Sequence, residues 1–170
     1  ARGAAVNGLP DDTVLALARW GGARGRDLWI GTASGLARLA GTTLVIYGRS
    51  VGFGAGVRSL VPAQVAGGGT SLMAATYGAG LAEIRDDGRW TMLSTREGLP
   101  ENHLYTLMSA GDPPHRRLWI GTSASGVARQ EPARWRGFAE GDGLPHRNVV
   151  GVGELERPDG VHTWVGTVGG

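Results

Sequence analysis

The 170-residue sequence contains no cysteine and no lysine. The lack of cysteine excludes disulfide bonds, thiolate metal sites and cysteine nucleophiles. The lack of lysine means that all 17 basic residues are arginines, and they are interleaved with 15 carboxylates to a formal net charge of only +2. No basic stripe of the kind that binds a phosphate backbone is present. We therefore expect no nucleic-acid partner.

Long apolar runs are also missing. No stretch approaches the roughly 18 apolar residues needed to cross a bilayer. Residues 1–10 lack the charged, then apolar, then small-residue pattern of a signal peptide. With 41% hydrophobic and 19% charged residues, the composition is that of a globular chain rather than a disordered one. Any contact with a membrane is expected only through segments outside this sequence.

Glycine is abundant, and it accompanies an internal repeat. The chain holds 31 glycines, well above the roughly 7% of average proteins. The segment Leu-Trp-Ile-Gly-Thr at 28–32 recurs letter for letter at 118–122, as Thr-Trp-Val-Gly-Thr at 163–167, and in degenerate form at 72–76. These segments start 44, 46 and 45 residues apart. A second marker with the same period, Gly-Leu-Pro, begins at Gly8, Gly98 and Gly143.

Each repeat is predicted to form four short strands separated by turns rich in glycine and proline. In the first repeat the strands are expected at 13–18, 28–32, 35–39 and 44–47. Four strands in about 45 residues are typical of a β-propeller blade. Because a blade lies between two others, both faces of its inner strands are buried, and Leu-Trp-Ile needs no alternation with polar residues. The following glycine, as in Gly31, is expected where two backbones approach closely.

The predicted fold class is therefore all-β, a partial β-propeller of about 3.5 four-stranded blades. The blades are expected near residues 8–50, 51–97, 98–142 and 143–170, the last one incomplete. An open arc leaves an apolar face bare at each end. We expect the remaining blades of the parent chain, or a second copy in a homodimer, to cover these faces. The alternative is a closed four-bladed monomer that borrows a strand from the N-terminus.

The repeat resembles a known family. Gly98-Leu99-Pro100-Glu101-Asn102-His103-Leu104, followed by Leu-Trp-Ile-Gly-Thr and Gly126-Val127, is similar to the two-component-regulator propeller repeat of sensor regions in bacterial hybrid histidine kinases. The second repeat lacks both Gly-Leu-Pro and the tryptophan, and the fourth has Arg147 in place of Asn102. The resemblance implies a periplasmic or otherwise extracytoplasmic sensor module that is not itself catalytic. A kinase or cyclase domain would lie outside this sequence.

The loops that contain or follow Gly-Leu-Pro, 94–102 and 139–148, are expected on one face of the propeller and form the candidate ligand site. Histidine is the side chain that titrates near neutral pH, and no two histidines are spaced for joint metal ligation. We therefore predict no metal and no cofactor. The ligand would be an unidentified small molecule or saccharide. The candidate ligand-binding residues are Arg96, Glu97, Asn102, His103, His146 and Arg147.

Alternatives to a sensor are kept open. Each of these residues could instead be a solvated turn residue. A propeller enzyme, a lyase or hydrolase, would gather histidine and carboxylates from loops of several blades, although no serine-hydrolase or nucleotide-binding motif is present and no catalytic residue is assigned. A scaffold for protein partners is the third class. The tryptophans, spaced at the repeat, are expected to pack between blades, except Trp20, which is expected at the surface.

Overall fold

The computed structural model describes residues 4–5, 8–21, 27–49, 53–65, 69–111 and 117–170. In the described part of the chain the regular structure is almost entirely β, arranged in four antiparallel sheets that we call blades 1 to 4. Blade 1 contains β2 (Val14–Arg19), β3 (Leu28–Thr32), β4 (Gly35–Ala40) and β5 (Thr43–Tyr47). Blade 2 contains β6 (Gly56–Gln64), β7 (Thr70–Tyr77), β8 (Gly80–Ile84) and β9 (Trp90–Leu93). Blade 3 contains β10 (Leu104–Ala110), β11 (Arg117–Thr122), β12 (Val127–Gln130) and β13 (Trp135–Phe138).

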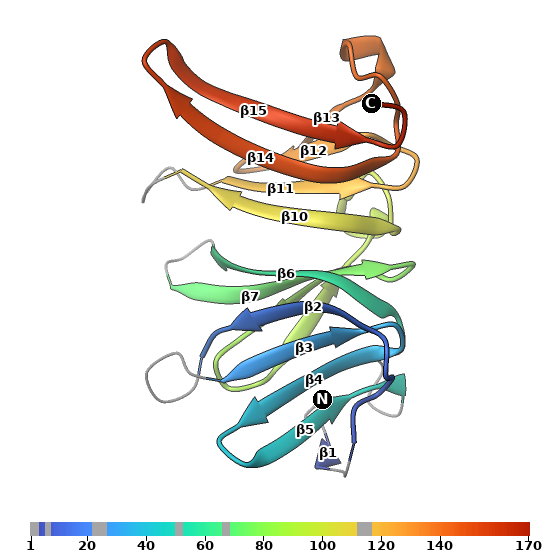
Figure 1. The fold of residues 1–170 in the computed structure, drawn as a ribbon, viewed down its shortest axis with the longest axis vertical. Coiled ribbons are helices and arrows are strands. Elements are labelled where there is room, and N and C mark those ends of the chain that lie inside the picture. The colour runs from blue at the N-terminus through green and yellow to red at the C-terminus, as the bar shows by residue number, and fades with distance from the viewer. Residues whose placement is uncertain (1–3, 6–7, 22–26, 50–52, 66–68, 112–116) are drawn as a thin grey trace.

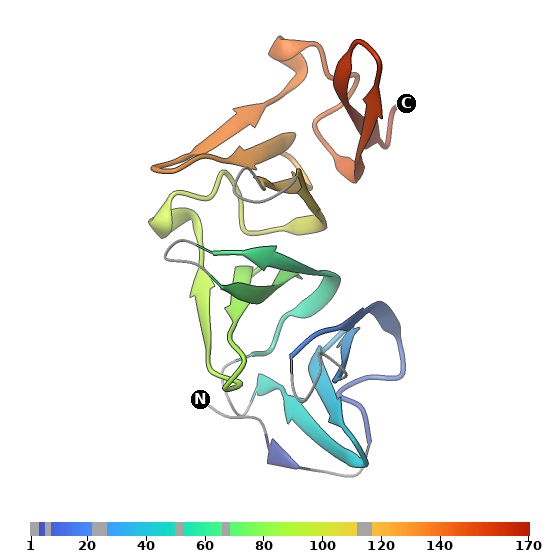
Figure 2. The ribbon, with the colours of Figure 1, turned by 90° about the vertical axis from the view of Figure 1, so that its left-hand side faces the viewer.

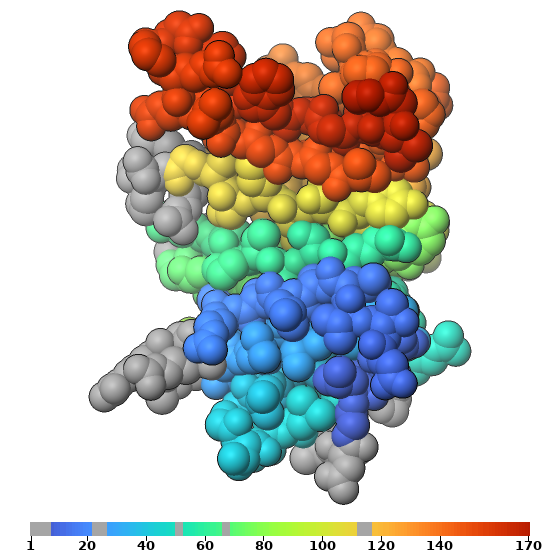
Figure 3. Space-filling model, in the orientation of Figure 1, coloured from blue at the N-terminus to red at the C-terminus, as the bar shows by residue number. Residues whose placement is uncertain are grey.

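Blade 4 is a hairpin of β14 (Val149–Arg157) and β15 (Gly160–Thr167). The first strands of the four blades lie side by side, in the order β2, β6, β10, β14, and form the inner-strand face (Figure 1). The blades follow one another along the long axis (Figure 2), and in the space-filling view they form bands in direct contact (Figure 3). The prediction of an all-β partial propeller is confirmed.

The N-terminal strand does not close the ring. β1 (Ala4–Ala5) pairs with β5 at the outer edge of blade 1. Within the described residues β15 pairs only with β14. Blades 1 and 4 therefore stand at opposite ends of an open arc (Figure 1). The alternative of a closed four-bladed monomer with a borrowed N-terminal strand is wrong for this structure, because that strand adds to its own blade.

The hydrophobic core lies between blades rather than inside any one of them. Trp29 of blade 1 is 1% exposed and shares a cluster with Leu72 of blade 2. Leu81 of blade 2 packs with Leu104 of blade 3, and Trp119 of blade 3 packs with Val149 of blade 4. Since each blade has two apolar faces, stacking is the only arrangement that buries both.

The glycine after the repeated tryptophan allows the next blade to approach. A Cβ atom on Gly31 would lie 2.8 Å from both the Cγ1 atom and the carbonyl oxygen of Val57. A Cβ atom on Gly121 would lie 2.8 Å from Cγ1 of Val149. Real Cβ atoms do not come this close to a neighbour, so the prediction of a close approach is confirmed at these two positions.

Trp20 is buried, contrary to the prediction that it lies at the surface. Its exposed fraction is 7%, and its ring lies 6.1 Å from that of Trp29 between centroids. The Trp20 amide donates to the carbonyl of Asp27 over 3.0 Å, and its own carbonyl accepts from Nε1 of Trp29 over 3.1 Å. The first bond extends the β2–β3 pairing by one step, and the second holds the Trp20 backbone against the Trp29 indole.

Candidate functional site

Each inner strand carries a β-bulge near its start. The pairing of β10 with β11 passes from Leu104 directly to Thr106, and the same register shift occurs in the other three blades. A bulge bends the strand, re-aims one side chain and is common beside functional sites. Because the inner strands run side by side in the same direction (Figure 1), the four bulges form one row. The bulged residues, which we call the rim, are Leu15, Arg58, Tyr105 and Val150.

A cluster of one cation and three aromatic rings lies at the middle of the rim. The guanidinium carbon of Arg58 is 4.7 Å from the ring centroid of Tyr77 and 4.8 Å from that of Tyr105. The two phenol rings are 5.5 Å apart, and the imidazole of His103 meets the Tyr77 ring edge-on at 4.9 Å. We call these four residues the Arg58 cluster. It is built from two blades, because Arg58 and Tyr77 belong to β6 and β7, while Tyr105 belongs to β10 and His103, which directly precedes β10, bridges to Tyr77.

The cluster presents an accessible positive charge. The Arg58 side chain is exposed, and within the described residues no carboxylate lies in ion-pair distance of its guanidinium. The side-chain hydrogen bond with Tyr105 raises the pKa of Tyr77 above its usual value, so this phenol is neutral at physiological pH. The cluster therefore offers guanidinium and hydroxyl donors beside aromatic faces, which suits an anionic group on a small organic ligand.

Glu101 lies next to the Arg58 cluster and contacts both His103 and the β11–β12 turn. Its carboxylate accepts from the hydroxyl of Ser123 and from the Ala124 amide at 2.8 Å, and it lies 3.7 Å from Nδ1 of His103. Burial raises the pKa of Glu101, but the hydrogen bonds from Ser123, Ala124 and neighbouring groups outweigh it and hold the pKa below its usual value. The charged carboxylate thus anchors the β11–β12 turn and lies beside the His103 ring.

Two of the predicted site residues, Asn102 and Glu97, already accept hydrogen bonds from the loop that contains them. The side-chain oxygen of Asn102 accepts from the amide of Thr95 over 2.9 Å, and its carbonyl accepts from the amides of Gly78 and Gly80, each over 3.0 Å. Glu97 accepts from both the amide and the hydroxyl of Ser94 at 2.7 Å, which completes a capping box on the 3-10 turn η2 (Thr95–Glu97). Only the Asn102 carbonyl reaches blade 2, where it joins the segment before β10 to the β7–β8 turn; the other bonds are local to the 94–102 loop.

The other predicted residues lie in the segments that precede β10 and β14, with Arg96 on η2 and the sequence neighbours His146 and Arg147 just before β14. Arg147 forms an ion pair with Glu140 of the 3-10 turn η3 (Glu140–Asp142) at 3.0 Å, and this contact lowers the pKa of Glu140. Nδ1 of His146 accepts from the amide of Asn148 over 3.0 Å. Arg96 is exposed on η2. Of the six predicted residues, the structure brings only His103 into the Arg58 cluster.

Sequence reasoning did not select Arg58, Tyr77, Tyr105 or Glu101 as site residues. Tyr77 and Tyr105 lie inside segments whose apolar character indicates packing, and the bulge positions are visible only once the strand register is known. One sequence signal could have indicated that Arg58 and Tyr105 are equivalent. Each directly follows the first apolar residue of its strand, Val57 and Leu104. His115 lies outside the described residues, and His162 pairs with Asp159 at 3.0 Å in the β14–β15 hairpin.

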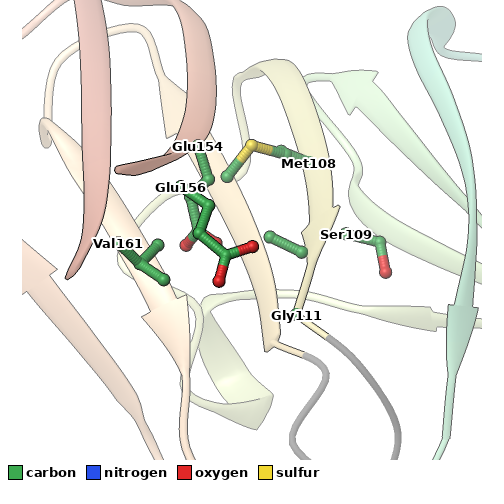
Figure 4. A pocket seen from close by; sticks show the side chains of 7 residues that line it. Met108, Ser109, Gly111, Glu154, Glu156 and Val161 are labelled. Atoms are coloured by element: carbon green, nitrogen blue, oxygen red, sulfur yellow. The ribbon is translucent and has the colours of Figure 1, made fainter. Parts of the chain in front are cut away.

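A cavity of about 360 Å³ lies at the opposite end of the inner strands, between blades 3 and 4. Figure 4 shows the side chains of Met108, Glu154 and Glu156 lining it. Oε1 of Glu154 accepts from Nε1 of Trp119 over 2.9 Å, so this carboxylate is already engaged. Within the described ranges no group of three or more histidine, aspartate or glutamate side chains could hold a metal ion. In the same ranges no helix is long and apolar enough to cross a membrane.

Comparisons with known proteins identify the fold. No family model and no curated protein matches the sequence. The extracellular domain of BT3049, a candidate hybrid two-component system of B. thetaiotaomicron, matches 95% of this chain with a TM-score of 0.74 and 17% identity. The extracellular domain of BT4673 from the same organism matches 91% of the chain with a TM-score of 0.59 and 19% identity.

The matched regions are 21% of the BT3049 chain and 20% of the BT4673 chain, so this chain spans about a fifth of the solved chains it resembles. BT4673 is described as a one-component system in that structure and as a hybrid two-component system in another, which matches at a TM-score of 0.57 and 13% identity. The chain therefore shares the fold of part of the extracellular domains of bacterial signalling systems, the class of protein that its repeat resembles.

Proposed function

We propose that the chain is a non-catalytic ligand-recognition module of an extracytoplasmic bacterial sensor, and that its ligand binds at the Arg58 cluster. The observation that carries this proposal is an exposed guanidinium held against two phenol rings, with no carboxylate partner in the described part of the chain. The fold shared with extracellular domains of signalling systems supports the sensor role. The ligand is a small molecule or saccharide that carries an anionic group.

The cluster can convert binding into a mechanical signal because it bridges two blades. A ligand that contacts Arg58 of blade 2 and Tyr105 of blade 3 together binds one relative arrangement of these blades more tightly than another. Only such a difference in affinity can shift a conformational equilibrium. The altered packing of blades 2 and 3 would pass to effector domains outside this chain.

The chemistry of the neighbouring groups favours binding over catalysis. Glu101 is the carboxylate next to His103, and its oxygens are engaged by Ser123 and Ala124. Its lowered pKa keeps it charged at neutral pH, which makes it a poor proton donor. The enzyme alternative would have to use His103 or the phenols of Tyr77 and Tyr105 as its acid and base.

An NMR titration tests the proposal. Sodium glucuronate is added to ¹⁵N-labelled protein, with glucose as the uncharged counterpart and phosphate as the bare anion. We expect glucuronate to shift the amide signals of Tyr77 and Tyr105 and glucose to shift them far less. Arg58→Gln should abolish the preference for glucuronate. Arg136→Gln, which removes an exposed arginine lying 5.1 Å from the ring centroid of Phe138, is the matched control and should retain it.

Two outcomes would contradict the proposal. One is the absence of any shift at the Arg58 cluster with all three probes. The other is binding that is as strong in Arg58→Gln as in the unmodified chain. The same mixtures, followed by mass spectrometry with a glucuronate-containing disaccharide, test the enzyme alternative. A cleavage product that disappears in His103→Gln would favour a lyase or hydrolase.

A further inference from the structure

The three junctions between neighbouring blades differ at the end that lies away from the rim. Leu72 of blade 2, Leu118 of blade 3 and Thr163 of blade 4 pair with their inner strands at the same step. Leu72 and Leu118 are 0% and 3% exposed, and each belongs to the cluster that joins its blade to the preceding one. Thr163 is exposed. The apolar side chain that closes the first two junctions is therefore replaced by a polar one at the third.

The side chain on the opposite side of the junction differs as well. Trp20 follows Arg19 on the inner strand of blade 1, and Ala110 follows Ser109 at the equivalent step of β10. The indole of Trp20 fills the junction between blades 1 and 2, where it belongs to the shared core cluster. Ala110 offers only a methyl group at the same place.

A small side chain alone does not open a junction. Ala63 of blade 2 holds the same step as Ala110, but it is 3% exposed and shares a cluster with Leu118. The third junction has Ala110 on one side and Thr163 in place of the leucine on the other. This junction holds the cavity of about 360 Å³ described above, which we call the junction cavity. Its volume lies within the range of about 300–1,000 Å³ that is typical of ligand pockets.

The junction cavity combines apolar walls with two carboxylates. Met108 and Ala110 line it from β10, and Val161 lines it from β15. Glu154 and Glu156 lie two residues apart on β14, so their side chains are on the same face of the strand. In Figure 4 both glutamate side chains extend into the space beside β10. A ligand in this space would contact apolar groups and carboxylate oxygens together.

The two carboxylates give the cavity a negative charge. Nε1 of Trp119 donates to Oε1 of Glu154 over 2.9 Å, which positions this carboxylate and leaves its second oxygen for another donor. Within the described residues no arginine lies in ion-pair distance of Glu154 or Glu156. Arg129 of blade 3 pairs with a neighbouring glutamate at 3.0 Å. Arg117, at the start of β11, is exposed and is not among the lining residues.

We propose that the junction cavity binds a small organic ammonium ion with a flat apolar body, an arylalkylamine. Its ring takes the place that the Trp20 indole fills at the first junction. Its ammonium group binds Glu156 and the second oxygen of Glu154, and hydrogen bonds between oppositely charged groups are stronger than those between neutral groups. A calcium ion fits less well, because it takes about six to eight oxygen ligands, and the described residues offer no group of three or more carboxylate or histidine side chains.

This inference is independent of the proposed function. The junction cavity and the Arg58 cluster lie at opposite ends of the inner strands. The cavity binds a cation through carboxylates, whereas the cluster binds an anion through a guanidinium. A failure at one site therefore leaves the other proposal standing.

An NMR titration of the ¹⁵N-labelled full chain with tryptamine hydrochloride tests the proposal. Indole-3-acetate, which has the same ring system and the opposite charge, is the first comparison, and calcium chloride is the second. We expect tryptamine to shift the amide signals of Ala110, Glu156 and Val161 in a saturable way. Indole-3-acetate and calcium should leave these signals in place.

Variants separate the contribution of the charge from that of the space. Glu156→Gln removes one charge from an exposed side chain and should weaken tryptamine binding about tenfold. Asp12→Asn, which removes an exposed carboxylate from blade 1, is the matched control and should bind like the unmodified chain. Ala110→Trp supplies the indole from the chain itself, as Trp20 does at the first junction, and should abolish binding. Thr163→Leu should close the cavity and have the same effect.

Several results would overturn the proposal. One is the absence of a saturable shift with tryptamine in the unmodified chain. Another is equal binding of indole-3-acetate, because the carboxylates would then not select the ligand. Undiminished binding in both Glu156→Gln and Ala110→Trp would place the amine elsewhere. Arg58→Gln should leave tryptamine binding unchanged, and a loss of binding in this variant would also contradict the assignment to the junction cavity.

Discussion

Replacing Gly121 by alanine tests how blades are held together. The added Cβ atom would lie 2.6 Å from Cγ2 of Thr106, 2.8 Å from Cγ1 of Val149 and 3.0 Å from the carbonyl oxygen of Val149. The two side chains can yield by small rotations, but the carbonyl moves only if blade 4 moves away from blade 3. The substitution therefore forces the junction open or leaves the methyl group overpacked.

The size of the effect follows from two opposing contributions. Overpacking a core by one methyl group costs about 1–3 kcal/mol. Alanine in a strand gains about 0.5–1 kcal/mol over glycine because the unfolded chain is less free. We expect a net loss of roughly 1–2 kcal/mol in the free energy of unfolding. For a chain of this length the midpoint of thermal unfolding should fall by about 2–8 °C.

Urea denaturation followed by circular dichroism measures the change, with thermal unfolding as the second readout. The Cβ atom of Gly137→Ala meets nothing within 4 Å. This variant should therefore gain stability from the less free unfolded chain without any cost of overpacking, by about 0.5–1 kcal/mol. Equal stability of Gly121→Ala and Gly137→Ala would refute the reasoning that glycine is required for the blades to approach.

Three further predictions concern other contacts. The folded-state pKa of Glu101 lies below its usual value of 4.5, so its stabilising contribution is present above that pH and is lost as the pH falls below it. Glu101→Gln should cost about 1–2 kcal/mol at pH 7 and reduce the acid dependence of urea unfolding between pH 6 and pH 3. Leu36→Ala, at a fully buried position, should cost about 2–5 kcal/mol in the same assay, whereas Leu17→Ala at an exposed position should leave the monomer nearly unchanged. Arg147→Ala removes an exposed ion pair with Glu140, and its small effect on the thermal midpoint should vanish at high salt.

The fold could be predicted because two sequence markers share one period. In the first repeat, the strand expected at 28–32 begins and ends where the pattern placed it. Inner strand β6 continues to Gln64, beyond the apolar run that ends at Val61. Pro62 indicates a strand end by sequence, yet it is tolerated here because β6 is an edge strand of its sheet and needs no amide donor on the inner side.

The candidate site could be predicted only in part. His103 was selected because it follows Gly-Leu-Pro, and the structure places it in the Arg58 cluster. Glu97 and Asn102 were selected because they lie in the predicted ligand loop 94–102, although the Ser94-x-x-Glu97 pattern is that of a capping box and indicates a structural role for Glu97. Arg58 and Tyr105 come from different repeats, and their side chains meet only because two bulged strands are neighbours.

The stacking of blades has a consequence for how the molecule loses its structure. In the described part of the chain the extensive tertiary contacts run between neighbouring blades, so folding energy is distributed along the stack as in a one-dimensional array. Opening can then start at an end without disturbing the middle. Amide hydrogens of the β14–β15 hairpin, which is covered on one side only, should exchange first, and those of blade 2, which is covered on both sides, should exchange last.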